Sequence, residues 1–291
     1  EFRYREPMLD ENTLVIVISQ SGETADTLEG AREAKAAGAS VLAITNVVGS
    51  SVARESDMVV YLWAGPEISV ASTKAYTSML IALYLIGFYF GDVAGRVDEA
   101  EMQTMLRALE ALPEQAEEIL APENIDRIKA IAAEYKDAKD LFYIGRGMDW
   151  AVAQEGALKL KEISYIHAEA YAAGELKHGT LALISDETPV ISVALQQKTF
   201  DKTMSNTEEM ISRMVDENGD VSGAKVLAVV QKGQQNISAK IHHVIEIPVC
   251  PDFISPVLAA IPLQLIAYFT ALVRGCNIDK PRNLAKSVTV E

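Results

Sequence analysis

The chain has 291 residues, of which 49% are hydrophobic and 23% charged, and its formal net charge at pH 7 is −15. This composition is typical of a folded protein with one large domain or two domains of ordinary size. The negative charge argues against nonspecific binding of nucleic acid or of an anionic membrane, because both attract Lys and Arg. A local basic site for one small phosphate stays compatible with it.

The sequence also bounds the compartment and the cofactors. Cys250 and Cys276 are the only cysteines, so no disulfide framework is predicted and a reducing cytoplasm fits. The first residues, EFRYRE, lack the apolar core of a signal peptide. Two apolar stretches, residues 79–91 and 254–274, are predicted to be buried helices, because the first is too short for a bilayer and the second contains prolines. No His, Cys and Asp residues have metal-ligand spacing, so no metal is expected.

The first half of the chain alternates strands with helices. Residues 13–19 (TLVIVIS) form a continuous β-branched run, which is typical of a strand covered on both faces. A polar turn leads to an Ala- and Glu-rich helix at residues 24–37. This alternation indicates a parallel sheet in an α/β fold. The further elements predicted in this half are a strand at 40–45, a short helix at 51–55 and a strand at 57–62.

The second half repeats this order. Strands are predicted at residues 188–194, 225–230 and 242–247, and a helix at residues 200–215. When Thr13 is aligned with Thr188, the second half still has a strand at 140–145 and a long helix at 149–166 that have no counterpart in the first. The repeat therefore predicts that a strand and a helix belonging before Glu1 are missing from the first half.

Residues 96–136 join the two halves and are predicted to be helices that break at Pro113 and Pro122. The last stretch has no helical period and is predicted to be an ordered tail or loop. We therefore expect a first domain at residues 1–120, a second at 121–275, and a C-terminal tail at 276–291.

The first candidate site is the polar turn at residues 19–24 (SQSGET), between a buried strand and a helix. Ligands of α/β sheets bind at this edge, and amides at a helix N-terminus favour an anion. Three hydroxyls can donate to phosphate oxygens, and Gly22 permits close approach of the backbone. An ordinary helix cap is the alternative, but a cap needs only one hydroxyl.

The second candidate is a charged stripe on the long helix. Glu155, Lys159 and Glu162 are spaced so that they share one helix face. On a surface they would be a plain row of ion pairs. Their neighbours are apolar, however, and buried carboxylates beside a lysine have perturbed protonation and can act as general acid or base.

Two further residues stand as single candidates. His178 lies between glycines in GELKHG and could move protons near neutral pH, although a lone histidine is more often structural. Lys286, in the tail segment RNLAKS, could form a Schiff base if a dry pocket lowered its pKa, and a solvated lysine is the alternative. His167 is predicted to be structural at a helix end.

These residues resemble a known family. The turn at residues 19–24 resembles the phosphosugar loop of sugar isomerase (SIS) domains, and residues 155–179 and 281–291 (PRNLAKSVTVE) closely resemble the isomerase half of the glucosamine-6-phosphate synthases. The resemblance implies two SIS domains, each a parallel sheet sandwiched by helices in three αβα layers. It also implies that the first domain lacks its N-terminal strand.

In that family, also called glutamine–fructose-6-phosphate aminotransferases, the isomerase half binds fructose 6-phosphate. It converts this sugar with ammonia to glucosamine 6-phosphate, the precursor of hexosamines and cell-wall amino sugars. The ammonia comes from a separate glutaminase domain, which is not expected within this chain. The resemblance further implies a cytoplasmic homodimer without a cofactor.

The resemblance assigns roles by position. Glu162 is expected to move a proton between C1 and C2, Lys286 to form an imine at C2, and His178 to assist ring opening in the site of a neighbouring subunit. Contacts to the phosphate, the sugar or the same pocket are expected from Ser19, Gln20, Ser21, Thr24, Val70, Glu155, Lys159 and Ala285.

Two other functions share the phosphate loop. A deglycase acting on a phosphorylated fructosamine would have no reason to keep the tail PRNLAKSVTVE. A sugar-phosphate sensor normally adds a DNA-binding module and would not need Lys286 together with Glu162. Both alternatives therefore fit the sequence less well.

Overall fold

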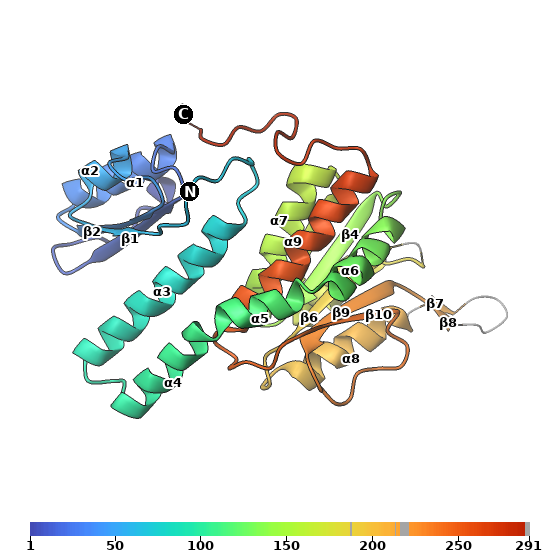
Figure 1. The fold of residues 1–291 in the computed structure, drawn as a ribbon. Coiled ribbons are helices and arrows are strands. Elements are labelled where there is room, and N and C mark those ends of the chain that lie inside the picture. Colours follow the sequence, from blue (N-terminus) through green and yellow to red (C-terminus); the bar gives the residue numbers. More distant parts are fainter. Residues whose placement is uncertain (187, 213, 216–220, 289–291) are drawn as a thin grey trace. The chain divides into compact units, whose positions relative to one another are not determined.

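The computed structural model describes residues 1–186, 188–212, 214–215 and 221–288. The chain divides into two compact units (Figure 1). The first comprises Glu1–Met102 together with the tail from Arg282, and the second comprises Gln103–Pro281. These units are compact bodies of this chain and do not test the SIS domain limits expected at residues 120 and 275, which stay predictions.

The first unit contains a parallel sheet of β1 (Leu14–Ser19), β2 (Ser40–Thr45) and β3 (Met58–Tyr61), in that order. One face packs against α1 (Ala25–Ala36), whose small residues Ala31 and Ala34 are fully buried and let the helix approach closely. The short α2 (Ser51–Glu55) adds Val52 to the same core. These elements match the predicted ones to within a residue or two.

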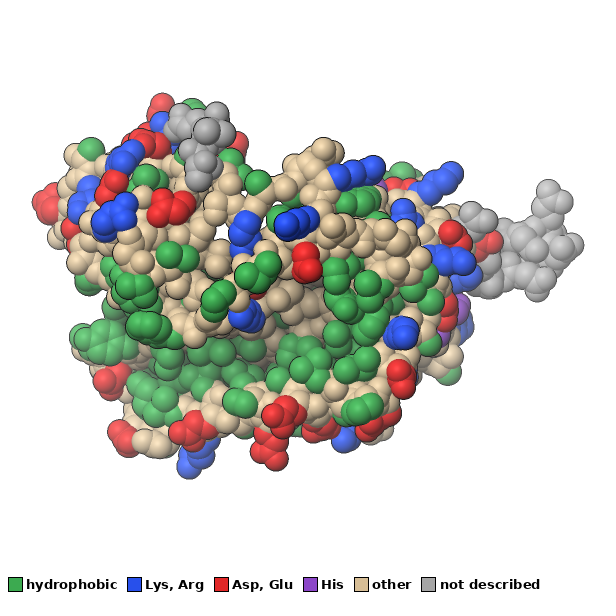
Figure 2. Space-filling view, turned by 45° about the horizontal axis from the view of Figure 1, so that its top comes forward, with side chains coloured by type: hydrophobic (Ala, Val, Ile, Leu, Met, Phe, Trp, Pro, Cys, Tyr) green, Lys and Arg blue, Asp and Glu red, His purple; other side chains and the backbone are tan. Residues whose placement is uncertain are grey.

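The long apolar helix of the first unit is α3 (Lys74–Val93), which α4 (Glu99–Glu110) follows. Both α3 and α9 (Ser255–Val273) are long and apolar enough to cross a membrane, but 61% of the apolar window of α9 is buried inside the protein, against 6% of that of α3. The prediction of a buried helix is therefore confirmed for α9 and wrong for α3. Hydrophobic side chains also gather on the face of the molecule drawn in Figure 2.

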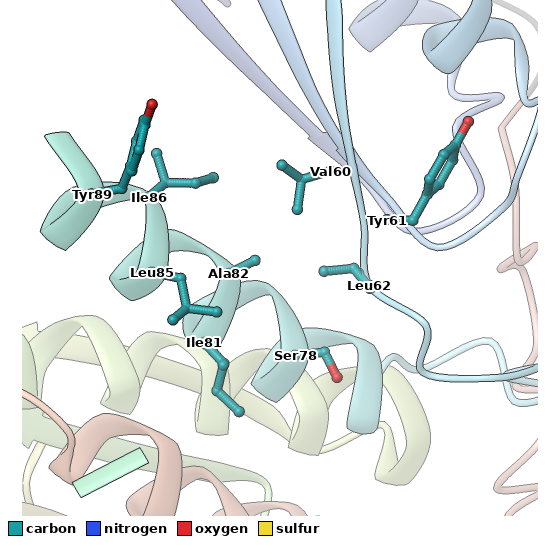
Figure 3. A pocket seen from close by; sticks show the side chains of 9 residues that line it. All are labelled: Val60, Tyr61, Leu62, Ser78, Ile81, Ala82, Leu85, Ile86 and Tyr89. Atoms are coloured by element: carbon teal, nitrogen blue, oxygen red, sulfur yellow. The ribbon is translucent and has the colours of Figure 1, made fainter. Parts of the chain in front are cut away.

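An apolar groove of about 410 Å³ lies between β3 and α3 (Figure 3). Val60 and Leu62 point from the strand side toward α3, where Ala82 faces them. The nine lining residues include no Lys, Arg, His, Asp or Glu. Because nothing in this groove can balance a phosphate charge, its chemistry does not fit a sugar phosphate.

The second unit is built on a parallel sheet with the order β10-β9-β6-β4-β5. Along β6 the side chains alternate, so that Val190 and Ala194 pack toward α8 while Ile191 and Val193 are buried on the opposite face. The strands are β4 (Asp140–Gly145), β5 (His167–Ala172), β6 (Pro189–Ala194), β9 (Lys225–Gln231) and β10 (His243–Ile247), and α8 is Phe200–Ile211.

Helices cover both faces of this sheet, which gives the three αβα layers that the resemblance implied (Figure 1). On the face opposite α8, α7 (Met148–Ser164) packs on the sheet and against α9. The two helices approach closely at Gly156, where an added Cβ would lie 2.9 Å from Leu263. The outer helices are α5 (Leu112–Ile119) and α6 (Pro122–Glu134), and two short 3-10 helices lie at Ala173–His178 and Thr180–Leu183.

Two local predictions are corrected. The helix expected at residues 200–215 ends at Ile211, because β7 (Met214–Val215) pairs with β8 (Val221–Ser222) as an antiparallel hairpin. His167 does not end a helix. It begins β5, where its Nδ1 lies 2.8 Å from Asp140 on the neighbouring strand.

The internal repeat is visible in the structure. The order β6, α8, β9, β10, α9 in the second unit matches β1, α1, β2, β3, α3 in the first. In the described part of the first unit, β4, α7 and β5 have no counterparts. The counterpart of α3, α9, is buried mainly by packing on α7 and α6.

Candidate functional site

The turn at residues 19–24 connects β1 to α1 and is folded by its own hydroxyl groups. Ser19, which is 6% exposed, accepts a hydrogen bond of 3.0 Å from the amide of Gly22, and its Oγ lies 3.3 Å from that of Thr24. Ser21 Oγ accepts one of 3.2 Å from the amide of Glu23. The hydroxyls are thus held in fixed positions around the start of a helix.

The side chain of Thr24 does not act as an ordinary helix cap. Thr24 is the N-cap residue of α1, but its side chain makes no capping hydrogen bond. The turn therefore combines a helix N-terminus with a cap hydroxyl that is not used for capping. Both features favour an anion at this position.

Gly22 is required by its conformation and by its surroundings. Its φ is +66°, and an added Cβ would lie 2.1 Å from Ser50 Oγ. Ser50 is 2% exposed, and its hydroxyl has no hydrogen-bond partner among the described residues. The turn thus packs on a buried serine that leaves no room for a side chain.

The acidic residue of the turn, Glu23, is hydrogen-bonded to the start of α2. Both carboxylate oxygens of Glu23 accept hydrogen bonds from Ser51, at 2.8 Å from the amide and 2.7 Å from the hydroxyl. These hydrogen bonds lower the pKa of Glu23, and the bond from the Ser51 hydroxyl has the larger effect. The negative charge of Glu23 is thus stabilised by hydrogen bonds at the start of α2. This makes the hydroxyl groups of the turn more favourable for binding a phosphate.

The predicted Schiff-base lysine lies in the first unit, and it has a partner that the sequence did not reveal. Lys286 Nζ lies 2.8 Å from Glu67 Oε2 and 3.4 Å from Ser72 Oγ. The Glu67 side chain is 5% exposed and that of Lys286 24%. Lys286 is therefore half-buried and ion-paired, which contradicts the alternative of a solvated lysine.

The tail that carries Lys286 is bonded to α1, directly after the turn at residues 19–24. The amide of Ala25, the first residue of α1, donates a 3.0 Å hydrogen bond to the carbonyl of Val288. Ala285 is exposed beside the lysine, and Val70 is half-buried in the loop between β3 and α3. The first unit thus brings together the turn, the loop and the tail.

The charged stripe of α7 forms one cluster in the second unit, as its spacing predicted. Lys159 Nζ lies 2.5 Å from Glu162 Oε2 and 3.5 Å from Glu155 Oε1. The three side chains are between 5% and 20% exposed. Burial raises the pKa of Glu155 to about 7. The positive charge of Lys159 lowers this pKa by a smaller amount, and repulsion from Glu162 raises it further. A pKa shifted by burial beside a charged partner is typical of functional sites.

His178 lies outside α7, the helix that carries this cluster. It is the last residue of the 3-10 helix Ala173–His178, and Gly179 follows with a φ of 140°. The His178 side chain is 76% exposed, with its Nε2 4.0 Å from Glu175 Oε2. The histidine is thus presented on a surface.

Sequence reasoning missed Glu67, Ser72 and Ser50. No local pattern marks Glu67, because its partner Lys286 is 219 residues away along the chain. Ser50 could have been suspected only as the cap of a short helix. In the part of the chain that the structure describes, no group of three or more His, Cys, Asp and Glu residues could hold a metal ion.

Comparisons with known proteins agree with this geometry. Residues 1–87 and 134–274 match the family model of the SIS domain. The chain is 51% and 52% identical, over its whole length, to the glutamine–fructose-6-phosphate aminotransferases (isomerizing) of Clostridium tetani and Clostridium acetobutylicum. It covers 46% of each, so it spans about half the length of these curated relatives.

A solved structure covers most of the same region. The C-terminal domain of glucosamine-fructose-6-phosphate aminotransferase from Francisella tularensis is 37% identical, with a TM-score of 0.88 over 96% of this chain and 76% of that one. The chain therefore belongs to the SIS domain family, and within it to the C-terminal, isomerase half of the glutamine–fructose-6-phosphate aminotransferases.

Proposed function

We propose that this chain binds fructose 6-phosphate and, in the complete protein, converts it with ammonia to glucosamine 6-phosphate. The observation that carries the proposal is Lys286, which is half-buried, ion-paired and held by its tail beside the turn at residues 19–24. A reactive amine next to a phosphate-binding turn is what covalent catalysis on a ketose phosphate needs. The names of the relatives support the same reaction.

The turn binds the phosphate in this proposal. Amides at the N-terminus of α1 and the hydroxyls around it donate to the phosphate oxygens. The contacts to phosphate and sugar come from Ser19, Gln20, Ser21 and Thr24, with a backbone contact from Val70 and with Ala285 next to the lysine.

The covalent step takes place at C2 of the open-chain sugar. The amine of Lys286 attacks the C2 carbonyl, and loss of water leaves an imine between Nζ and C2. Ammonia then adds to C2 as the bond from C2 to Nζ breaks, which returns the lysine and leaves the nitrogen on the sugar. Binding the substrate covalently holds it for the next step.

The α7 cluster moves the proton. Glu162 removes a proton from C1 and returns it to C2, which makes C1 an aldehyde and C2 an amine-bearing carbon. Lys159 supplies positive charge beside Glu162, and Glu155 holds a proton near neutral pH on the other side of the same lysine. The stripe thus provides a base with a charged neighbour rather than a row of surface ion pairs.

His178 opens the sugar ring from a neighbouring subunit of a homodimer in this proposal. Its 76% exposed side chain is available to a second copy of the chain. The location is cytoplasmic, which the two free cysteines Cys250 and Cys276 support. If the shared site is right, mixing His178→Ala and Glu162→Gln chains restores part of the activity.

Reductive trapping tests the proposal. Borohydride added to the full-length protein with fructose 6-phosphate should attach the sugar to Lys286, located by peptide mass spectrometry. A Lys286→Arg variant, which keeps the charge, should not be labelled. A label on a different lysine, or none, would show that Lys286 does not form the imine.

A further inference from the structure

Glu67 is the one acidic side chain that the structure describes in contact with Lys286, and the proposed reaction gives it no role. It lies in the loop between β3 and α3. Its Oε2 lies 2.8 Å from Lys286 Nζ, the atom that attacks the sugar. A buried carboxylate that touches a reacting nitrogen can do more than hold the tail in place.

The carboxylate is fixed from its other side. The amide of Thr73 donates to Glu67 Oε1 at 2.8 Å and that of Ala75 at 3.3 Å, both at the start of α3. One oxygen is thus anchored to a helix N-terminus, and the other is left for the lysine. Such anchoring means that no reorganisation is needed when charge changes on Nζ.

The environment also favours the ionised carboxylate. Burial opposes ionisation of Glu67, but the hydrogen bonds from Lys286 and from the two amides outweigh it, so that its pKa lies below the usual range. Glu67 therefore rests as a carboxylate in its ion pair with Lys286. An ammonium cannot attack a carbonyl, so the nucleophile must first lose a proton.

We propose that Glu67 is the proton acceptor for Lys286 during imine formation and the counter-ion of the protonated imine afterwards. The inference rests on the proposed function, because it takes Lys286 as the imine-forming residue. It adds to that function a catalytic group which neither the sequence motifs nor the names of the relatives indicate.

The protons balance in this scheme. Glu67 takes one proton from the Lys286 ammonium, and the neutral amine attacks C2 to give a carbinolamine after a proton passes from nitrogen to the former carbonyl oxygen. Glu67 then gives its proton to the C2 hydroxyl, which leaves as water while the nitrogen lone pair forms the double bond. The products are a protonated imine, water and the original carboxylate, and the imine's positive charge replaces that of the ammonium beside Glu67.

The competing explanation is a purely structural ion pair. In that case the carboxylate would only anchor the tail, and its loss would act through disorder of the tail and of the site. Asp57 in the first unit is a matched control. It accepts a 2.8 Å hydrogen bond from the amide of Val41 and forms a 2.7 Å ion pair with Lys35. This second anchored carboxylate–lysine pair has no contact with Lys286.

The test measures the rate of borohydride trapping at Lys286 in the full-length protein with fructose 6-phosphate, for wild type, Glu67→Gln, Glu67→Ala and Asp57→Asn. Because general acid–base groups typically contribute about 100-fold or more, Glu67→Gln should slow trapping by about that factor while the dissociation constant of glucose 6-phosphate changes by less than about threefold. Asp57→Asn should trap at the wild-type rate. Formate should restore trapping in Glu67→Ala, which leaves space for it, and not in Glu67→Gln.

The outcomes distinguish failure of the proposed function from failure of the role of Glu67 alone. Wild type that is not labelled at Lys286 overturns the proposed function and this inference with it. Wild type that is labelled, with Glu67→Gln within about threefold of its rate, overturns only the role of Glu67. Slow trapping accompanied by lost sugar affinity and no rescue by formate also overturns it, in favour of the structural pair.

A folding defect has its own check. If thermal melting shows that Glu67→Gln and Glu67→Ala do not fold, Glu67→Asp takes their place, because it keeps the charge but withdraws it from Nζ. Trapping slowed about tenfold with unchanged affinity for glucose 6-phosphate then supports the inference, and a wild-type rate overturns it.

Discussion

The carbonyl of Val288 accepts a 3.0 Å hydrogen bond from the amide of Ala25, so the C-terminal tail is fastened to the first residue of α1. This bond lies two residues beyond Lys286 and one residue beyond the turn at residues 19–24. It ties the position of Lys286, the proposed imine-forming residue, to the turn that we propose binds the phosphate.

Ala25→Pro removes this bond while keeping the helix. Proline lacks the amide hydrogen but suits the first helical position, and Thr24 before it is already extended with a ψ of 117°. Losing one hydrogen bond of about 1 kcal/mol should slow borohydride trapping at Lys286 by about fivefold. Ala25→Ser, which keeps the amide, should trap at the wild-type rate; equal slowing in both variants would contradict the role of the bond.

Gly22→Ala should weaken binding of the sugar phosphate. Its Cβ would lie 2.1 Å from Ser50 Oγ, and overpacking of this kind typically costs about 1–3 kcal/mol, or roughly 5- to 150-fold in affinity if it distorts the turn. Gly49→Ala is the control, because Gly49 also has a positive φ, +71°, but no atoms near an added Cβ. Calorimetric titration with glucose 6-phosphate measures both, and equal losses would show that strain alone is responsible.

Glu155 should make the stability of the protein depend on pH. Its pKa is raised from about 4.5 when unfolded to about 7 when folded, so the folded state binds more protons between these values and stability falls as pH rises through this window. Glu155→Gln should reduce this slope in thermal melts. The slope should not vanish, because burial also raises the pKa of Asp149, to about 6. An unchanged slope would mean that Glu155 ionises normally.

The apolar groove between β3 and α3 should be covered in the full-length protein. The repeat predicts that a helix equivalent to α7 packs there, as α7 packs on α9 in the second unit. Amide hydrogen exchange along α3 should then be slower in the full-length protein than in this chain alone, and exchange along α9 should be the same in both. Equal exchange along α3 would contradict the prediction.

The fold was predictable where a pattern is local. The apolar runs of β1 and β4 and the alternation of strands with helices indicated parallel sheets, and the structure shows them. β5 was missed because its sequence, HAEAYA, has no β-branched residue and acquires its strand geometry by pairing with β4. The exposure of α3 was mispredicted because burial depends on a packing partner, which composition does not specify.

The candidate site was predictable to the same degree. Glu155, Lys159 and Glu162 lie within two turns of one helix, so their spacing alone placed them together. Glu67 could not be found in this way, because only the folded tail brings Lys286 to it. For the same reason the sequence did not show that Lys286 is half-buried, because only the folded tail places it beside Glu67.

The most direct test of the central claim is isomerisation without nitrogen. Full-length protein is incubated with fructose 6-phosphate and no glutamine, and glucose 6-phosphate is measured with a coupled dehydrogenase. Glucose 6-phosphate should form, and Glu162→Gln should slow its formation by about 100-fold or more, because the group that moves the proton between C1 and C2 is lost. Absence of glucose 6-phosphate with the wild-type protein, or formation at the wild-type rate with Glu162→Gln, would contradict it.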